Sequence, residues 1–265
     1  KTINELIVPT EKTKELFKDK YKVKREVYVI PSGIDTTRFY KENIDKNEII
    51  NLKKDLGLKK TDFIVLYVGR IAKEKSIDFL INNFNSVLNR IPKAKMIIVG
   101  DGPDIKDLID LTRKKGLENK IIFTGKAPWT DVPKYYSLCD LFVTASKTET
   151  QGLTVMEAMG ASKPVVAIRD ESFELMITDK KDGLFFDDEK SYVDMIYEVY
   201  KNKKLRDEIS FNARLTADKY SPCNYAKNVL KVYDKVISKD TNVVKKVVHN
   251  VKKIFTKSGG KKWKN

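Results

Sequence analysis

Short apolar runs alternate with amphipathic segments through the middle of this chain. The strand-sized runs occupy residues 63–68, 96–99, 121–124, 141–144, 164–168 and 183–186. Between the first two runs, apolar residues recur at spacings of three and four from Ile77 to Ile91, which places one apolar stripe on a helix. Continuous apolar strands that alternate with helices predict a parallel sheet covered by helices on both faces.

Right-handed crossovers between such strands predict an α/β fold with a doubly wound, Rossmann-like parallel sheet. A strand at 6–9 and a helix at 10–20 are expected before the sheet, and two helices at 205–219 and 225–236 are expected after it. Ser221-Pro222 separates the last two helices. Ligands of doubly wound sheets bind beyond the carboxyl ends of the strands, so functional residues are expected in the strand-to-helix loops.

The composition suits a globular domain, since 41% of the 265 residues are apolar. The longest apolar runs are strand-sized, far below the roughly 18 to 20 residues of a membrane span. The two cysteines, Cys139 and Cys223, fit packed thiols in a reducing compartment better than a disulfide framework. The chain begins at Lys1 with no leader-like segment, and we expect it to be a fragment of a longer protein.

The formal net charge of +15 is concentrated at one end, because residues 239–265 hold nine lysines and one acid, Asp240. At helical periodicity, Lys245, Lys246, Lys252 and Lys253 lie opposite a valine-rich face, as in helices that dock on anionic membranes. The alternative is a solvated tail without structure, which the β-branched valines and Gly259-Gly260 favour. A nucleic-acid partner is not expected, because the aromatics do not interleave with the lysines.

Two common nucleotide motifs are incomplete in this chain. Gly100-Asp101-Gly102 lacks the third glycine of the dinucleotide fingerprint, since Ile105 stands there, and no phosphate-binding loop ending in Gly-Lys-Ser/Thr exists. A tight turn into a helix is the simple interpretation of Gly100–Pro103. The loop after the first strand offers Arg70 and Lys75, which suit a diphosphate, although a solvated basic loop would look the same.

A second candidate loop follows the strand at 141–144 and leads into a helix. Glu149 lies in the loop and Glu157 in the helix, with Gly152 between them. Glycine lets the backbone approach a ligand, and the amides at the helix start favour anions. A carboxylate within the helix can accept two hydrogen bonds from a ribose diol. The setting of the two glutamates, more than their spacing, indicates a binding site.

Together these motifs resemble the retaining glycosyltransferases of family 4, whose two-Rossmann-domain architecture is called GT-B. The resemblance is to the carboxyl-terminal donor domain and covers residues 28–236. It rests on residues 31–35, Gly69-Arg70 with Lys75, residues 100–103, residues 123–125, and the Glu-x7-Glu motif from Glu149 to Glu157. Ser76 stands where many members have glycine. The loops around Lys75 and Glu149 look most like those of bacterial diacylglycerol glucosyltransferases, which use UDP-glucose.

The resemblance implies a role for each motif residue. Arg70 and Lys75 would hold the donor diphosphate and stabilise the departing nucleotide, Glu149 would contact the donor sugar, and these three would form the catalytic set. Glu157 would bind the ribose, Lys126 would line the base pocket, and the backbone from Gln151 to Thr154 would hold sugar and phosphates. The full expected donor-binding set is Gly69, Arg70, Lys75, Lys126, Glu149, Gln151, Gly152, Leu153, Thr154 and Glu157.

Retention of configuration follows from the resemblance, as does transfer without a bound metal or other cofactor. The residues agree on the metal, because the only histidine, His249, lies outside the motifs. We expect a remnant of the acceptor domain and linker at 1–27, a nucleotide-sugar-binding domain at 28–238 and a basic amphipathic tail at 239–265. The acceptor lipid would be read by the missing domain, and the protein would lie in the cytoplasm on the inner face of the cell membrane.

Other readings of the same residues remain. A family member could act on a different glycan or polysaccharide acceptor. A non-catalytic module could keep the fold and bind a nucleotide sugar or a membrane without transferring anything.

Overall fold

The computed structural model describes residues 3–239, which fall into two compact units. The larger unit comprises Ser32–Pro222. The smaller unit joins residues 3–31 to residues 223–239 within the described part of the chain. The tail expected at 239–265, with the four lysines expected to contact a membrane, lies outside the described residues apart from the last residue of the final helix.

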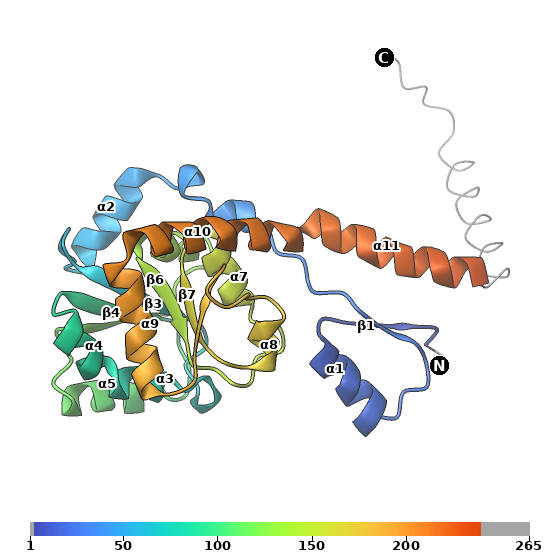
Figure 1. The fold of residues 1–265 in the computed structure, drawn as a ribbon, viewed down its shortest axis with the longest axis horizontal. Coiled ribbons are helices and arrows are strands. Elements are labelled where there is room, and N and C mark those ends of the chain that lie inside the picture. Colours follow the sequence, from blue (N-terminus) through green and yellow to red (C-terminus); the bar gives the residue numbers. More distant parts are fainter. Residues whose placement is uncertain (1–2, 240–265) are drawn as a thin grey trace, which may run out of the picture. The chain divides into compact units, whose positions relative to one another are not determined.

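A six-stranded parallel sheet forms the centre of the larger unit (Figure 1). Its strands are β3 (Phe63–Val68), β4 (Ala94–Val99), β5 (Ile121–Gly125), β6 (Leu141–Thr144), β7 (Val165–Ile168) and β8 (Leu184–Phe186). They are ordered β5-β4-β3-β6-β7-β8, so successive strands are added on one side of β3 up to β5 and on its other side from β6 onward. This is the strand order of a doubly wound sheet, and the predicted Rossmann-like α/β class is confirmed.

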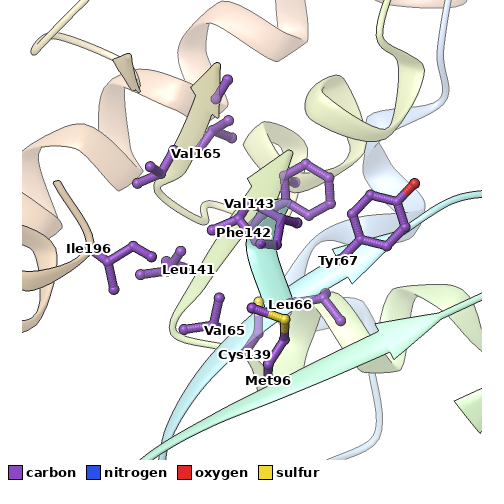
Figure 2. Close-up of a cluster of buried hydrophobic side chains, with 14 of the residues drawn as sticks. Val65, Leu66, Tyr67, Met96, Cys139, Leu141, Phe142, Val143, Val165 and Ile196 are labelled. Carbon is purple, nitrogen blue, oxygen red and sulfur yellow. The ribbon is translucent and has the colours of Figure 1, made fainter. Parts of the chain in front are cut away.

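The strands form because their side chains are buried on both faces. All residues of β3, β6, β7 and β8 are buried, and Val65, Leu66 and Phe142 are fully enclosed. Figure 2 shows such side chains from β3, β6 and β7 gathered in one cluster with Ile196. Burying each large apolar side chain contributes about 1.5 to 3 kcal/mol, which fixes the strands in register.

Two helical layers cover the sheet. One contains α3 (Ile77–Asn82), α4 (Phe84–Arg90), α5 (Ile105–Lys114) and α9 (Glu189–Lys201). The other contains α2 (Lys46–Asp55), α6 (Val132–Leu138), α7 (Leu153–Gly160) and α10 (Lys203–Ala217). A short helix, α8 (Glu171–Glu174), follows β7.

The single helix expected from Ile77 to Ile91 is wrong in one respect, because the structure has two helices there. Asn83 separates α3 from α4, and its side-chain amide donates to the carbonyl of Phe79 at 2.9 Å. A side chain that bonds its own backbone competes with the helical ladder, which explains the break. The apolar stripe still faces the core, since Ile77, Leu80 and Ile81 are buried.

The smaller unit contains β1 (Leu6–Val8) and β2 (Val27–Val29), which pair in parallel. Between them lie α1 (Glu11–Glu15) and a π-helical turn (Leu16–Lys20), and α11 (Pro222–Lys239) follows later in the chain. Within this unit, the Lys235 ammonium lies 3.1 Å from the Glu26 carboxylate and over the Tyr28 ring. From residue 3 to residue 239, the structure has no helix with the length and apolar character needed to cross a membrane.

Candidate functional site

The loops after β3, β4 and β5 line an open cavity of about 670 Å³ at the carboxyl ends of these strands. Gly69 and Arg70 line it from the loop after β3, and Lys126 lines it from the loop after β5. Open sheets bind ligands at this place because neighbouring loops diverge there. The structure thus brings together three residues of the predicted site, Gly69, Arg70 and Lys126, around one cavity.

Gly100 and Gly102, on the loop after β4, line the same cavity. A Cβ atom on Gly100 would lie 1.8 Å from the Gly69 carbonyl oxygen, and one on Gly102 would lie 2.0 Å from that of Ile71. Such contacts are impossible, so only glycine lets the two loops meet. The Ile71 amide donates to the Asp101 carbonyl at 2.9 Å across this contact. The glycine pair therefore shapes the cavity floor by holding the Arg70 loop against the next loop.

Lys75 and Glu149 form a direct ion pair, although they lie 74 positions apart in the sequence. The Lys75 ammonium is 2.5 Å from the Glu149 carboxylate, and their side chains are 19% and 21% exposed. Lys75 ends a one-turn 3₁₀ helix (Lys73–Lys75), which Ser76 terminates at φ +50°. This left-handed backbone favours glycine, which explains why glycine is common at this position in similar sequences, and Ser76 adopts the same conformation.

Arg70 is not part of this ion pair. Its side chain is 66% exposed, and its guanidinium lies 3.8 Å from the Glu74 carboxylate. The loop beneath it is fixed, because the Tyr67 hydroxyl donates to the Arg70 carbonyl at 3.1 Å. An exposed guanidinium on a fixed backbone is suited to reach a ligand anion in the cavity.

Four hydrogen bonds hold the loop that carries Glu149. The Ser172 hydroxyl donates to the Glu149 carbonyl at 2.6 Å, and the Thr148 hydroxyl donates to the Glu74 carbonyl at 3.2 Å. The Gln151 side chain accepts from the Ser32 amide at 2.9 Å, and its own amide donates to the Ser32 carbonyl at 3.2 Å. Gln151 is buried, so its side chain serves this loop contact and only its backbone remains for a ligand.

The helix α7 begins at this loop with Gly152 in the left-handed region, at φ +66°. A Cβ atom there would lie 2.7 Å from the Phe173 ring, so both backbone geometry and packing require glycine. The amides of Leu153 and Thr154 open the helix, and the first turn of a helix leaves its amides available to an anion. Leu153 is 47% exposed, which keeps this helix start accessible.

Glu157 lies one turn further along α7 and is largely buried. The Tyr136 hydroxyl, from α6, donates to Glu157 Oε2 at 2.9 Å and lies 3.1 Å from the Thr154 carbonyl oxygen. Burial raises the pKa of Glu157, while the hydrogen bond from Tyr136 and the positive charge of Arg38 oppose that rise. Burial also raises the pKa of Tyr136 well above its usual value, so its hydroxyl stays protonated and donates.

Some residues of this site were missed in the sequence. Tyr136 and Ser172 belong to no motif, and nothing in the residues beside them in the sequence distinguishes them from other helix positions. Ser32 lies in a recognised motif, but nothing in that motif indicates its contact with Gln151. Within residues 3–239, no group of three or more metal-ligating side chains lies close enough together to hold a metal ion.

The chain was compared with known families, curated proteins and solved structures. The sequence profile of the family "Glycosyl transferases group 1" matches residues 48–216. The chain is 34% identical to alpha-monoglucosyldiacylglycerol synthase of Acholeplasma laidlawii, over 91% of this chain and 60% of that protein. It is 31% identical to the protein of the same name from Streptococcus pneumoniae, over 89% of this chain and 53% of that protein. The chain therefore spans little more than half the length of these relatives.

A solved structure shares the fold. Anabaena HepE, crystallised with UDP and glucose, superposes with a TM-score of 0.77 at 20% identity, over 87% of this chain and 63% of that one. WaaG, a glycosyltransferase involved in lipopolysaccharide biosynthesis, gives 0.74 at 20% identity, over 86% and 62%. The family resemblance inferred from the motifs is confirmed, and this chain belongs to the group 1 glycosyltransferases.

Proposed function

We propose that this chain is the donor-binding part of a hexosyltransferase that moves glucose from UDP-glucose to a membrane lipid such as diacylglycerol, with retention of configuration. The observation that carries the proposal is the Lys75–Glu149 pair, at 2.5 Å, with Lys75 on the same strand-to-helix loop as Arg70, which lines the cavity. A cation for phosphate and a carboxylate for sugar hydroxyls are thereby in contact at one place. The resemblance to two glucosyldiacylglycerol synthases supports the choice of sugar and acceptor.

Each charged group then has a task in the transfer. Breaking the bond between the sugar C1 and the phosphate oxygen leaves negative charge on the nucleoside diphosphate. Arg70 and Lys75 stabilise that charge, assisted by the amides at the start of α7. Glu149 accepts hydrogen bonds from the sugar hydroxyls and Glu157 from the ribose hydroxyls, while Lys126 lies beside the base. No metal or other cofactor is assigned to this transfer.

The acceptor is proposed to bind outside the larger unit, in the part of the protein that corresponds to the remaining length of the relatives. The lysines at 245, 246, 252 and 253 are proposed to hold the protein on an anionic membrane, at the cytoplasmic face where the lipid acceptor is available. Vesicle flotation tests this point. Removing residues 240–265 should abolish most binding to anionic vesicles, and unchanged binding would contradict it.

Titration calorimetry with UDP and UDP-glucose tests the donor site. Arg70→Ala should weaken UDP binding by about tenfold or more, because a charge-assisted hydrogen bond contributes about 1.5 to 3 kcal/mol. Glu157→Ala should also weaken it, through the ribose. Lys204→Ala is the control, since this side chain lies on α10 and is 87% exposed. A wild-type chain that binds neither ligand, or an Arg70→Ala variant that binds UDP normally, would contradict the proposal.

A further inference from the structure

Tyr136 links the two parts of the site carried by α7. Its hydroxyl lies within 2.9 Å of Glu157 Oε2 and 3.1 Å of the Thr154 carbonyl oxygen. Thr154 belongs to the first turn of the helix, and Glu157 lies one turn on. A single hydroxyl therefore contacts both the carboxylate proposed for the ribose and the turn proposed for the phosphates.

The ring of Tyr136 has no freedom to move this hydroxyl elsewhere. The side chain is fully buried, with Phe39 edge-on at 5.5 Å and Phe142 at 5.8 Å between ring centroids. Close-packed rings hold one rotamer, so the hydroxyl is presented at a fixed point. The fixed partner restricts the Glu157 side chain, which would otherwise choose among several rotamers.

The Tyr136 hydroxyl has one proton to donate and two acceptors within reach, Glu157 Oε2 and the Thr154 carbonyl oxygen. A hydrogen bond to a charged acceptor is about twice as strong as one to a neutral carbonyl, so the proton goes to Glu157 rather than to Thr154. That bond occupies Oε2 of the carboxylate. Oε1 is left to accept from a ligand, and a carboxylate held by one oxygen presents the other in a defined direction.

We infer that Tyr136 is a positioning residue that orients Glu157 and thereby makes the site select a nucleotide with an intact ribose diol. Tyr136 does not touch the donor and acts through Glu157. The inference rests on the proposed donor site. It adds the residue that makes this site selective for the ribose of the nucleoside. A purely structural tyrosine would instead weaken every ligand alike when its hydroxyl was removed.

Binding of UDP and of 2′,3′-dideoxy-UDP to the chain separates these roles. In the wild type, UDP should bind about tenfold more tightly than the dideoxy analogue. In Tyr136→Phe, UDP affinity should fall by about tenfold, while affinity for the analogue should stay within about twofold of wild type, since no diol is present to be read. Equal losses for both ligands would show a structural role and overturn the inference.

Tyr192→Phe is a matched control. Tyr192 is also fully buried among aromatic rings, and its hydroxyl has no hydrogen-bond partner within the described residues. Its removal should leave both affinities unchanged. Circular dichroism before each titration verifies that the variants are folded.

Glu157→Asp tests the same geometry without altering the core tyrosine. The shorter side chain keeps its charge but withdraws the carboxylate from Tyr136, so discrimination between UDP and the dideoxy analogue should drop to about twofold or less. Full discrimination in this variant would overturn the inference even if Tyr136→Phe did not fold. A wild type that binds UDP but does not distinguish the two ligands would refute the ribose role of Glu157, whereas one that binds neither would refute the donor site itself.

Discussion

Replacing Glu149 by glutamine should have opposite effects on two ligands. In the structure, the Glu149 carboxylate occupies Lys75 at 2.5 Å, with both side chains about four-fifths buried. A diphosphate that binds Lys75 therefore competes with this carboxylate for the ammonium. Glutamine keeps the size of the side chain and one oxygen for Lys75 but removes the negative charge that competes with phosphate.

The magnitude follows from the loss of one charge. The Lys75 ammonium keeps its charge in this variant, so its hydrogen bond to glutamine is still charge-assisted and only the ion-pair attraction is lost, which is about 0.2 to 1 kcal/mol in exposed pairs. In this largely buried pair the competing interaction is thus weakened by about 1 kcal/mol, which corresponds to about a fivefold gain in affinity for UDP. UDP-glucose loses the charged acceptor for its sugar hydroxyls, so its affinity relative to UDP should fall.

Calorimetry of both ligands against wild type and Glu149→Gln measures these changes. Glu74→Gln is the matched control, because it removes one negative charge from the neighbouring loop without freeing Lys75. The Glu74 carboxylate contacts the Arg70 guanidinium at the long distance of 3.8 Å, and its side chain is 41% exposed. Exposed ion pairs contribute little, so the affinity of Glu74→Gln for UDP should stay within about twofold of wild type. A Glu149→Gln variant that binds UDP no more tightly than Glu74→Gln would refute the proposed competition between Glu149 and phosphate for Lys75.

Two further outcomes concern stability. Gly102→Ala should disrupt the cavity loops and lower the free energy of unfolding by about 3 kcal/mol or more, because its Cβ would lie 2.0 Å from the Ile71 carbonyl oxygen. Gly116→Ala is the control, since it has open space around it and should lower the free energy of unfolding by only about 1 kcal/mol. Chemical denaturation measures both values. Glu157→Gln should raise the melting temperature at neutral pH. Burial raises the pKa of Glu157 above its usual 4.5, so the charged carboxylate destabilises the folded chain. This destabilisation disappears as the pH falls through the raised pKa, because the carboxyl group is then protonated. The gain should therefore be present at pH 7 and absent near pH 4, with Tyr136 and Arg38 still facing position 157; a gain that persisted at low pH would exclude buried charge as its cause.

Local sequence patterns were sufficient to predict the parallel sheet and most of the helices of this protein. The strand pattern and its alternation with helices predicted the parallel sheet, because burial on both faces demands continuous apolar runs. The same reasoning predicted one helix where the structure has two, separated at Asn83. Hydrophobic periodicity does not reveal that the Asn83 side chain donates to the backbone carbonyl of Phe79. The predicted loops also proved to be the ones that carry Arg70, Lys126 and Glu149 at the carboxyl ends of strands.

Contacts between distant loops required the tertiary structure. Nothing within either motif indicates that Lys75 meets Glu149, that Gln151 holds Ser32 across 119 positions, or that a buried tyrosine orients Glu157. Hydrophobic periodicity specifies which face of an element is buried, and glycine specifies where backbone can turn or approach. Which polar groups then meet depends on how the loops pack over the sheet, and that is a property of the folded chain.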